Sequence, residues 1–126
     1  MNILVYGAGT IGLTYAWLLS NQHQVTVLVR EHKLSTLEQG FTLSIKDLRK
    51  DDQVYKEHHF QPPLVTSIDQ DYDLILLTVN SLQLEQALDH LAAIKEKAHL
   101  LILQNNWNIN SKIPSYLDRQ QVSLAF

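Results

Sequence analysis

The chain has 126 residues, with ten basic and thirteen acidic side chains, a net charge of −3 and no cysteine. The length fits one domain, and 45% hydrophobic with 18% charged residues indicate a soluble globular core rather than disorder. The lack of cysteine excludes disulfides, thiolate catalysis and cysteine-type zinc sites, and the lack of basic excess argues against a nucleic-acid partner. We expect no signal peptide and no membrane span, because no apolar run approaches the ~20 residues that cross a bilayer.

The first 30 residues predict a strand, a helix and a second strand. A short apolar run over residues 2–6 indicates a buried strand, and residues 25–29 indicate another. Residues 10–21 between them are typical of a helix. The spacing of its large apolar side chains predicts that one face packs on the sheet, formed by Ile11, Tyr15, Leu18 and Leu19.

Three glycines occupy the turn between the first strand and the helix. Gly7 allows a tight turn, Gly9 allows a pyrophosphate to approach the backbone, and Gly12 allows close packing of helix on strand. Amides of the first helical turn then face the phosphates. The pattern predicts a dinucleotide site formed by Gly7, Ala8, Gly9, Thr10, Ile11 and Gly12. The alternative is a tight glycine turn that binds no ligand.

Arg30 follows the second strand and bears on the choice of cofactor. In this position an arginine accommodates the 2′-phosphate of NADPH, whereas an acidic residue binds the 2′-hydroxyl of NADH. Arg30 therefore favours NADPH. Glu31 leaves NADH open if the strand ends one residue later, and the alternative for Arg30 is a solvated charge at a strand end.

The middle of the chain predicts a helix and an antiparallel pair of strands, over residues 31–39, 41–45 and 53–61. Leu34 and Leu37 are expected to face inward from this helix. His58 and His59 suggest a metal site at first sight. Neighbours on a strand point to opposite faces, so we expect no metal to be bound there.

The second half predicts alternating strands and helices, over residues 73–79, 82–95, 99–103, 114–117 and 121–126. The first of these helices has a buried stripe formed by Leu84, Ala87, Leu88, Leu91 and Ala92. Polar loops follow two strands, at Asn80 and Ser81 and at residues 104–106, where ligands of open α/β sheets bind. The order of elements predicts one doubly wound, Rossmann-type α/β domain with a mainly parallel sheet over residues 1–126.

With these motifs placed, essentially the whole chain resembles the N-terminal NADP-binding domain of the ketopantoate reductase family. The resemblance is carried by Tyr-Gly-Ala-Gly-Thr-Ile-Gly at 6–12, Val-Leu-Val-Arg at 27–30, Leu-Leu-Thr-Val-Asn-Ser at 76–81 and Leu-Gln-Asn at 103–105. It implies NADPH-dependent reduction of 2-dehydropantoate or a related small 2-oxo acid, a step of pantothenate biosynthesis in the cytoplasm. It also implies a cofactor site that includes Arg30, Thr78, Val79, Asn80 and Asn105, with Asn105 as the catalytic-site residue that orients cofactor or substrate.

Three departures from the family pattern bear on activity. Asn80 stands where the family has a lysine, and Asn106 stands where a glycine follows the motif asparagine. The family's helical C-terminal domain, which supplies the catalytic lysine, is expected to be absent. Reduction of a ketone needs a proton donor, and Asn105 is no acid. The chain alone is therefore expected to bind cofactor without turnover, the alternatives being a non-catalytic sensing module and a folded product that binds no ligand.

An apolar patch is expected where that domain would pack, formed by Trp107, Ile109, Ile113, Tyr116 and Leu117. Such patches are commonly buried in oligomers, so we expect a homodimer, with exchange of the C-terminal strand as one form.

Overall fold

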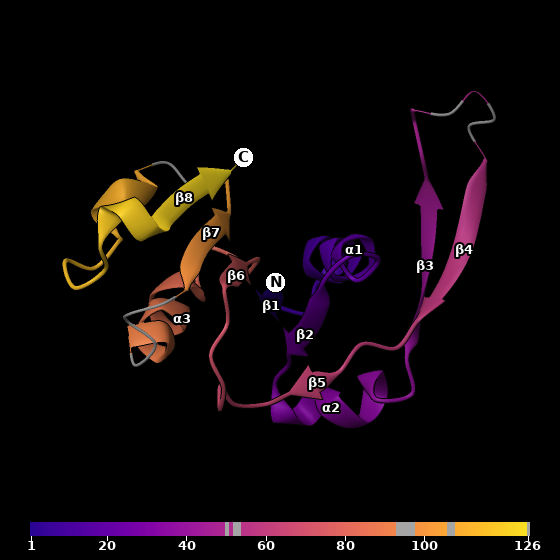
Figure 1. Cartoon of the computed structure of the whole chain (residues 1–126), viewed down its shortest axis with the longest axis horizontal. Coiled ribbons are helices and arrows are strands. Elements are labelled where there is room, and N and C mark those ends of the chain that lie inside the picture. Colours follow the sequence, from indigo (N-terminus) through magenta and orange to yellow (C-terminus); the bar gives the residue numbers. More distant parts are fainter. Residues whose placement is uncertain (50, 52–53, 93–97, 106–107, 126) are drawn as a thin grey trace.

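A computed structural model describes the chain except for residues 50, 52–53, 93–97, 106–107 and 126 (Figure 1). Six strands form one sheet in the order β5-β2-β1-β6-β7-β8, and every neighbouring pair is parallel. The strands are β1 Asn2–Tyr6, β2 Gln24–Leu28, β5 Leu64–Val65, β6 Leu74–Leu77, β7 His99–Leu103 and β8 Val122–Ala125. The predicted parallel doubly wound sheet is confirmed, and the two-residue edge strand β5 is an addition to it.

Helices cover both faces of this sheet. Successive residues of a strand point to opposite sides, so one strand supplies side chains to both cores. The α-helices of the described residues are α1 Thr10–Leu19, α2 Glu31–Leu37 and α3 Leu84–Leu91. Ile3 and Val5 of β1 belong to the core under α1 and α2, whereas Leu4 belongs to the core under α3. Leu34 and Leu37 pack partly against the first of these cores, as predicted. None of the described helices has the length and apolar character needed to cross a membrane.

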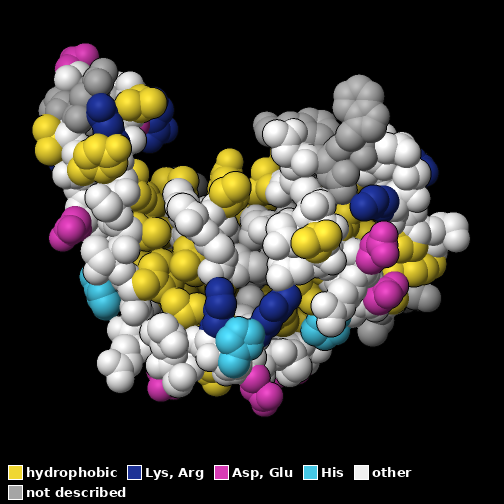
Figure 2. Space-filling view, turned by 180° about the vertical axis from the view of Figure 1, so that it is seen from behind, with side chains coloured by type: hydrophobic (Ala, Val, Ile, Leu, Met, Phe, Trp, Pro, Cys, Tyr) yellow, Lys and Arg dark blue, Asp and Glu magenta, His cyan; other side chains and the backbone are white. Residues whose placement is uncertain are grey.

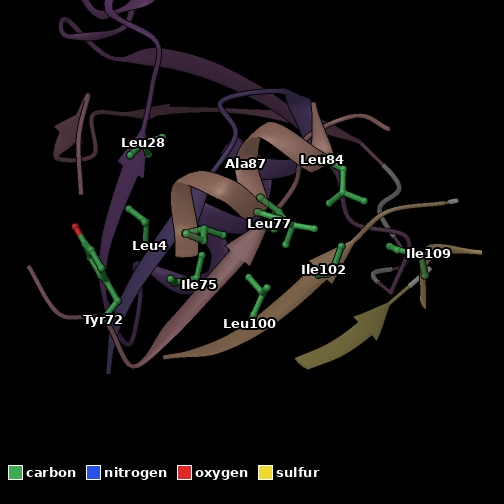
Figure 3. Packing of buried hydrophobic residues seen from close by; sticks show 12 residues of the cluster. Leu4, Leu28, Tyr72, Ile75, Leu77, Leu84, Ala87, Leu100, Ile102 and Ile109 are labelled. Carbon is green, nitrogen blue, oxygen red and sulfur yellow. The ribbon is translucent and has the colours of Figure 1, made fainter. Parts of the chain in front are cut away.

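The predicted inner face of α3 is confirmed. Its four buried residues are Leu84, Ala87, Leu88 and Leu91, and Figure 3 shows the helix lying over the side chains of Leu4, Ile75 and Ile102. Truncating a leucine in such a position typically costs about 2–5 kcal/mol. Ala92 is only half-buried, and the end of the predicted helix, residues 93–95, falls outside the described residues.

The predicted inner face of α1 is wrong. Gly12 and Ala16 are the buried positions, whereas Ile11, Tyr15 and Leu18 are 57%, 40% and 44% exposed. Only Leu19 of the predicted four packs against the core, and then partly. The helix carries no charged residue over its whole length, so apolar periodicity did not select a face. The small residues face inward because the helix lies close to the sheet beside the glycine turn.

A β-hairpin projects from the body of the molecule beyond α1 (Figure 1). Its strands, β3 Phe41–Lys46 and β4 Tyr55–Phe60, pair in antiparallel register as predicted. A two-stranded hairpin alone is marginally stable in water. This one is joined to α1 by ring packing of His58 on Trp17, with centroids 4.5 Å apart. His59 lies instead beside Gly40, so the two histidines do point to different faces.

The C-terminal segment differs from its prediction in two respects. Residues 114–117 form a turn rather than a helix, and short 3₁₀ helices occur at Ile109–Ser111 and Arg119–Gln121. The predicted apolar patch is contradicted at Ile109 and is only partly present at its other described residues. Ile109 is buried at 3% exposure, and Ile113 and Leu117 pack partly against the core under α3. Tyr116 is 37% exposed and its hydroxyl donates to the Leu88 carbonyl, whereas Trp107 lies outside the described residues.

Candidate functional site

The loop after β1 lies at the switch point of the sheet, where the order in which strands are added reverses. From β1 the chain adds β2 and β5 on one side, then returns to add β6, β7 and β8 on the other. The carboxyl ends of β1 and β6 are therefore neighbours, with Tyr6 in register with Leu77. Ligands of open α/β sheets bind in the crevice outside such a switch point.

Two of the three motif glycines are required by the fold itself. Gly7 has φ +122, and a Cβ there would lie 2.8 Å from the Thr78 hydroxyl oxygen. A Cβ on Gly12 would collide with the carbonyl oxygen of Gly7 and would lie 2.5 Å from the same hydroxyl. Both positions need glycine because the helix, the loop and the end of β6 are in close contact.

Thr78 ties the glycine loop to the end of β6. Its hydroxyl donates to the Gly7 carbonyl at 2.9 Å, and its backbone N–H donates to the Tyr6 carbonyl at 2.9 Å. The loop conformation is thus fixed by a hydrogen bond from an adjacent strand as well as by its own sequence. Thr78 acts as a positioning residue for the loop.

Gly9 differs from the other two glycines. Its backbone has φ −90 and ψ 179, an extended conformation that any residue can adopt. A Cβ at this position would meet no atom of the described residues within 4 Å. The fold therefore does not explain this glycine. Open space beside the first turn of α1 is the feature expected where a phosphate group approaches the backbone.

A cleft of about 490 Å³ opens between the glycine loop, the end of β2 and α3. Its volume is within the range of small-molecule sites, about 300–1,000 Å³. Among the described residues that line it, Arg30 and Lys33 are cationic and no side chain is a carboxylate. Glu31 is exposed and is not one of these lining residues. The cleft is therefore suited to an anionic ligand.

Tyr6 and His90 form a hydrogen-bonded pair in the same cleft. The Tyr6 hydroxyl and His90 Nδ1 are 3.0 Å apart, and the two rings meet edge to face with centroids 5.8 Å apart. Burial raises the pKa of the Tyr6 hydroxyl above its ordinary value, and the positive charge of Arg30 partly opposes this rise. The pair joins the end of β1 to the outer side of α3.

The cleft brings together seven of the predicted site residues, namely Gly7, Ala8, Gly9, Arg30, Thr78, Val79 and Asn80. Four others do not line it. Gly12 is buried beneath the loop, Thr10 and Ile11 are exposed at the start of α1, and Asn105 is exposed beyond β7.

Sequence reasoning missed the contribution of α3 to this cleft. Gln83, Gln86 and His90 line it from positions i, i+3 and i+7, the polar face beside the buried leucine stripe. That spacing was visible in the sequence. Lys33, one turn after Arg30, was visible in the same way.

The loop after β6 presents the amide of Asn80 to the cleft, whereas Gln104 and Asn105, described residues of the loop after β7, do not line it. The Asn80 side chain accepts a hydrogen bond from the Gln83 backbone N–H at 3.1 Å and so stabilises the turn before α3. The Gln104 side chain is buried and donates to the Val79 carbonyl at 3.0 Å. These contacts hold the two loops together, and Asn105 is exposed next to them.

Comparison with known proteins places this geometry in context. The family model described as ketopantoate reductase PanE/ApbA matches residues 3–126. The 2-dehydropantoate 2-reductase of Bacillus subtilis (strain 168) is 34% identical over 108 residues, which is 83% of this chain and 33% of that protein. This chain spans about a third of the length of the curated relatives it matches.

Solved structures show the same fold. A probable 2-dehydropantoate 2-reductase from Bacillus subtilis superposes with a TM-score of 0.69 and 30% identity, over 83% of this chain and 34% of that one. D-mandelate dehydrogenase in a ternary structure with NADH and anilino(oxo)acetate superposes with a TM-score of 0.79 over 98% of this chain and 40% of that one. At 19% identity, the second likeness concerns the fold alone.

Proposed function

This chain belongs to the ketopantoate reductase family, and on that basis we propose that residues 1–126 form an NADPH-binding domain of a reductase of 2-oxo acids. The observation that carries the proposal is the open space at Gly9, where the fold does not need glycine and a pyrophosphate does. The pyrophosphate would be held by backbone amides of the loop from Gly7 to Thr10. A bound nicotinamide cofactor supplies the hydride.

The proposal of NADPH rather than NADH rests on the charges in the cleft. Arg30 and Lys33 both line it, and the described lining includes no carboxylate to bind a ribose 2′-hydroxyl. Glu31, the residue that left NADH open, is outside the lining. The fold itself accommodates NADH in D-mandelate dehydrogenase, so the choice depends on these side chains.

Titration calorimetry of NADPH and NADH into the 126-residue chain tests this proposal. We expect Arg30→Ala to weaken NADPH binding about 10- to 100-fold, because a charge-assisted hydrogen bond contributes roughly 1.5–3 kcal/mol. NADH binding should change little. Arg49→Ala is a matched control, since Arg49 lies on the hairpin and pairs with Asp47. Equal affinity for the two cofactors, unchanged in Arg30→Ala, would contradict the proposal.

We propose 2-dehydropantoate or a related 2-oxo acid as the substrate of the complete reaction, in the cytoplasm, from the names of the relatives. The 126-residue chain is proposed to bind cofactor without turnover. The side chains at the ends of β6 and β7, from Thr78 to Asn80 and from Gln104 to Asn105, include no acid that can protonate an alkoxide. Asn105 is proposed to orient the bound molecules. Measurable NADPH oxidation with 2-dehydropantoate by the purified chain would contradict this.

A non-catalytic dinucleotide-binding module is the second candidate. The observation that favours it is Asn80, where the family has a charged lysine. The side chain of Asn80 is engaged in the turn before α3, through its bond with the Gln83 N–H. Asn80→Lys separates the two candidates when it is assayed together with the helical C-terminal domain of a family member. A gain of reductase activity would support the reductase domain. Cofactor binding with no gain of activity would support the non-catalytic dinucleotide-binding module.

A further inference from the structure

His90 lies in the wall that α3 contributes to the cleft, and the proposed function gives it no role. Its Nδ1 atom is 3.0 Å from the Tyr6 hydroxyl oxygen, and the two rings meet edge to face. Burial raises the pKa of the Tyr6 hydroxyl, and the positive charge of Arg30 opposes this rise. Arg30 therefore acts electrostatically on the oxygen that His90 contacts. These three side chains, from three segments of the chain, share one part of the cleft.

The described lining of the cleft carries positive charge and no carboxylate. Its titratable side chains come from β1, the start of α2 and α3, and they are Tyr6, Arg30, Lys33 and His90. The segment after β5 adds only the uncharged Thr66, and the acidic side chains of α3, Glu85 and Asp89, do not line the cleft. Figure 2 shows Lys and Arg side chains next to histidine side chains low on the body of the molecule, in the region of α2.

A bound anion would favour a positive charge on His90. An imidazole ordinarily gains its proton between pH 5 and 8, so neighbouring charges decide its state near neutral pH. A phosphorylated dinucleotide brings several negative charges into a cleft whose described lining has none. We propose that His90 takes up a proton as such a ligand binds and then serves as a third cation beside Arg30 and Lys33. This role of His90 rests on the proposed dinucleotide site and adds a binding residue to it.

The contact with Tyr6 suits both charge states of the ring. A neutral imidazole can accept a hydrogen bond from the hydroxyl at Nδ1, whereas a protonated ring carries N–H groups on both nitrogens and donates to the hydroxyl oxygen. The ring therefore needs no movement to gain its charge. His90 is exposed and its bond to Tyr6 uses Nδ1, so Nε2 is left to donate to a ligand. Because the ligand favours the protonated ring, its binding should tighten as the pH falls through the range in which His90 titrates.

NMR titration of the histidine ring protons is the first test, and it needs no variant. The chain has six histidines, and sequence-specific assignment identifies the resonance of His90. NADP⁺ is the probe, because NADPH decomposes in mild acid. We expect saturation with NADP⁺ to move the titration midpoint of His90 to higher pH by about 0.5–1 pH unit. His99 is the internal control, since its Nε2 also contacts a hydroxyl, that of Ser123 at 2.9 Å, and it does not line the cleft. A His90 midpoint that does not move would overturn the proposal.

Titration calorimetry in buffers of different ionisation enthalpy is the second test, because it counts the protons taken up on binding. His90→Gln keeps an acceptor for the Tyr6 hydroxyl and removes the titrating ring. We expect this variant to take up fewer protons than the unchanged chain and to lose a gain in NADP⁺ affinity of about 2- to 4-fold between pH 8 and pH 6.5. His99→Gln, the matched control, should keep both. The 2′-phosphate of the ligand also titrates in this range, so the comparison is made between chains.

The outcomes separate this role of His90 from the dinucleotide site itself. If NADP⁺ binds and His90→Gln takes up as many protons as the unchanged chain, the role of His90 is overturned and the site remains. If the unchanged chain binds neither NADP⁺ nor NADPH, both proposals are overturned. Proton uptake that disappears in His90→Gln and persists in His99→Gln would establish His90 as the third cation.

Discussion

Alanine substitutions at Gly9 and Gly12 should affect different properties, because Gly12→Ala should lower stability whereas Gly9→Ala should weaken ligand binding. Gly9 has an extended backbone, and its missing Cβ would point into open space. Gly12 is buried, and a Cβ there would collide with the Gly7 carbonyl oxygen and approach the Thr78 hydroxyl. The fold therefore requires glycine at position 12, whereas at position 9 only a bound ligand would require it.

The expected magnitudes follow from these contacts. Gly9→Ala should leave the free energy of unfolding unchanged or raise it by about 0.4–1 kcal/mol, because alanine restricts the unfolded chain. Gly12→Ala should lower it by about 3 kcal/mol, since the obstructing atoms include backbone that cannot move aside. For a domain of this size that loss corresponds to a fall in melting temperature on the order of 10 °C.

Thermal unfolding followed by circular dichroism, together with NADPH titration of each folded variant, provides the assay. We expect Gly9→Ala to melt at or above the temperature of the unchanged chain and to bind NADPH at least ~10-fold more weakly, a loss of about 1.4 kcal/mol. The methyl group would occupy the space that the pyrophosphate needs. If Gly9→Ala bound NADPH with unchanged affinity, or melted as low as Gly12→Ala, the reasoning from Gly9 would be refuted.

Substitutions at three further positions test the cleft. Thr78→Val removes the hydroxyl that donates to the Gly7 carbonyl and should cost about 1–3 kcal/mol by denaturant unfolding, whereas Thr78→Ser should cost less. Lys33→Ala should weaken NADPH binding a fewfold in calorimetry, more at low than at high salt, and leave NADH unchanged. Burial raises the pKa of Tyr6 in the folded chain, so stability should fall as the pH rises through about 10 and beyond. Tyr6→Phe should flatten this dependence in urea titrations, and a residual slope remains because burial also raises the pKa of Tyr116.

Strands were predicted well wherever the sequence itself is unambiguous. The runs at residues 3–6, 74–77 and 100–103 are continuously apolar, and such runs are typical of strands covered on both faces. β5 has only two residues and no periodicity, so no local pattern in the sequence predicted it. It forms because the chain returns from the hairpin along the edge of β2, with Leu64 opposite Val27.

The error at α1 has a physical cause. Periodicity assigns a helix face only when apolar and polar residues alternate around the axis, and α1 has no charged side chain to mark its outer face. In α3 the same rule worked because Glu85, Gln86 and Asp89 mark the exposed side. The predicted apolar patch failed at Ile109, because this side chain packs beneath α3 in its own chain.

The local sequence by itself determined the parallel sheet, the glycine turn and the cation that follows β2, because each depends on neighbouring residues and on strand periodicity. The tertiary structure decided which glycine the fold can spare, which residues of α3 reach the cleft, and which side of α1 stays exposed. Those properties depend on contacts between segments far apart in the chain, such as Thr78 with Gly7 and His90 with Tyr6. No local pattern of residues records the distance between two elements, and packing alone sets it.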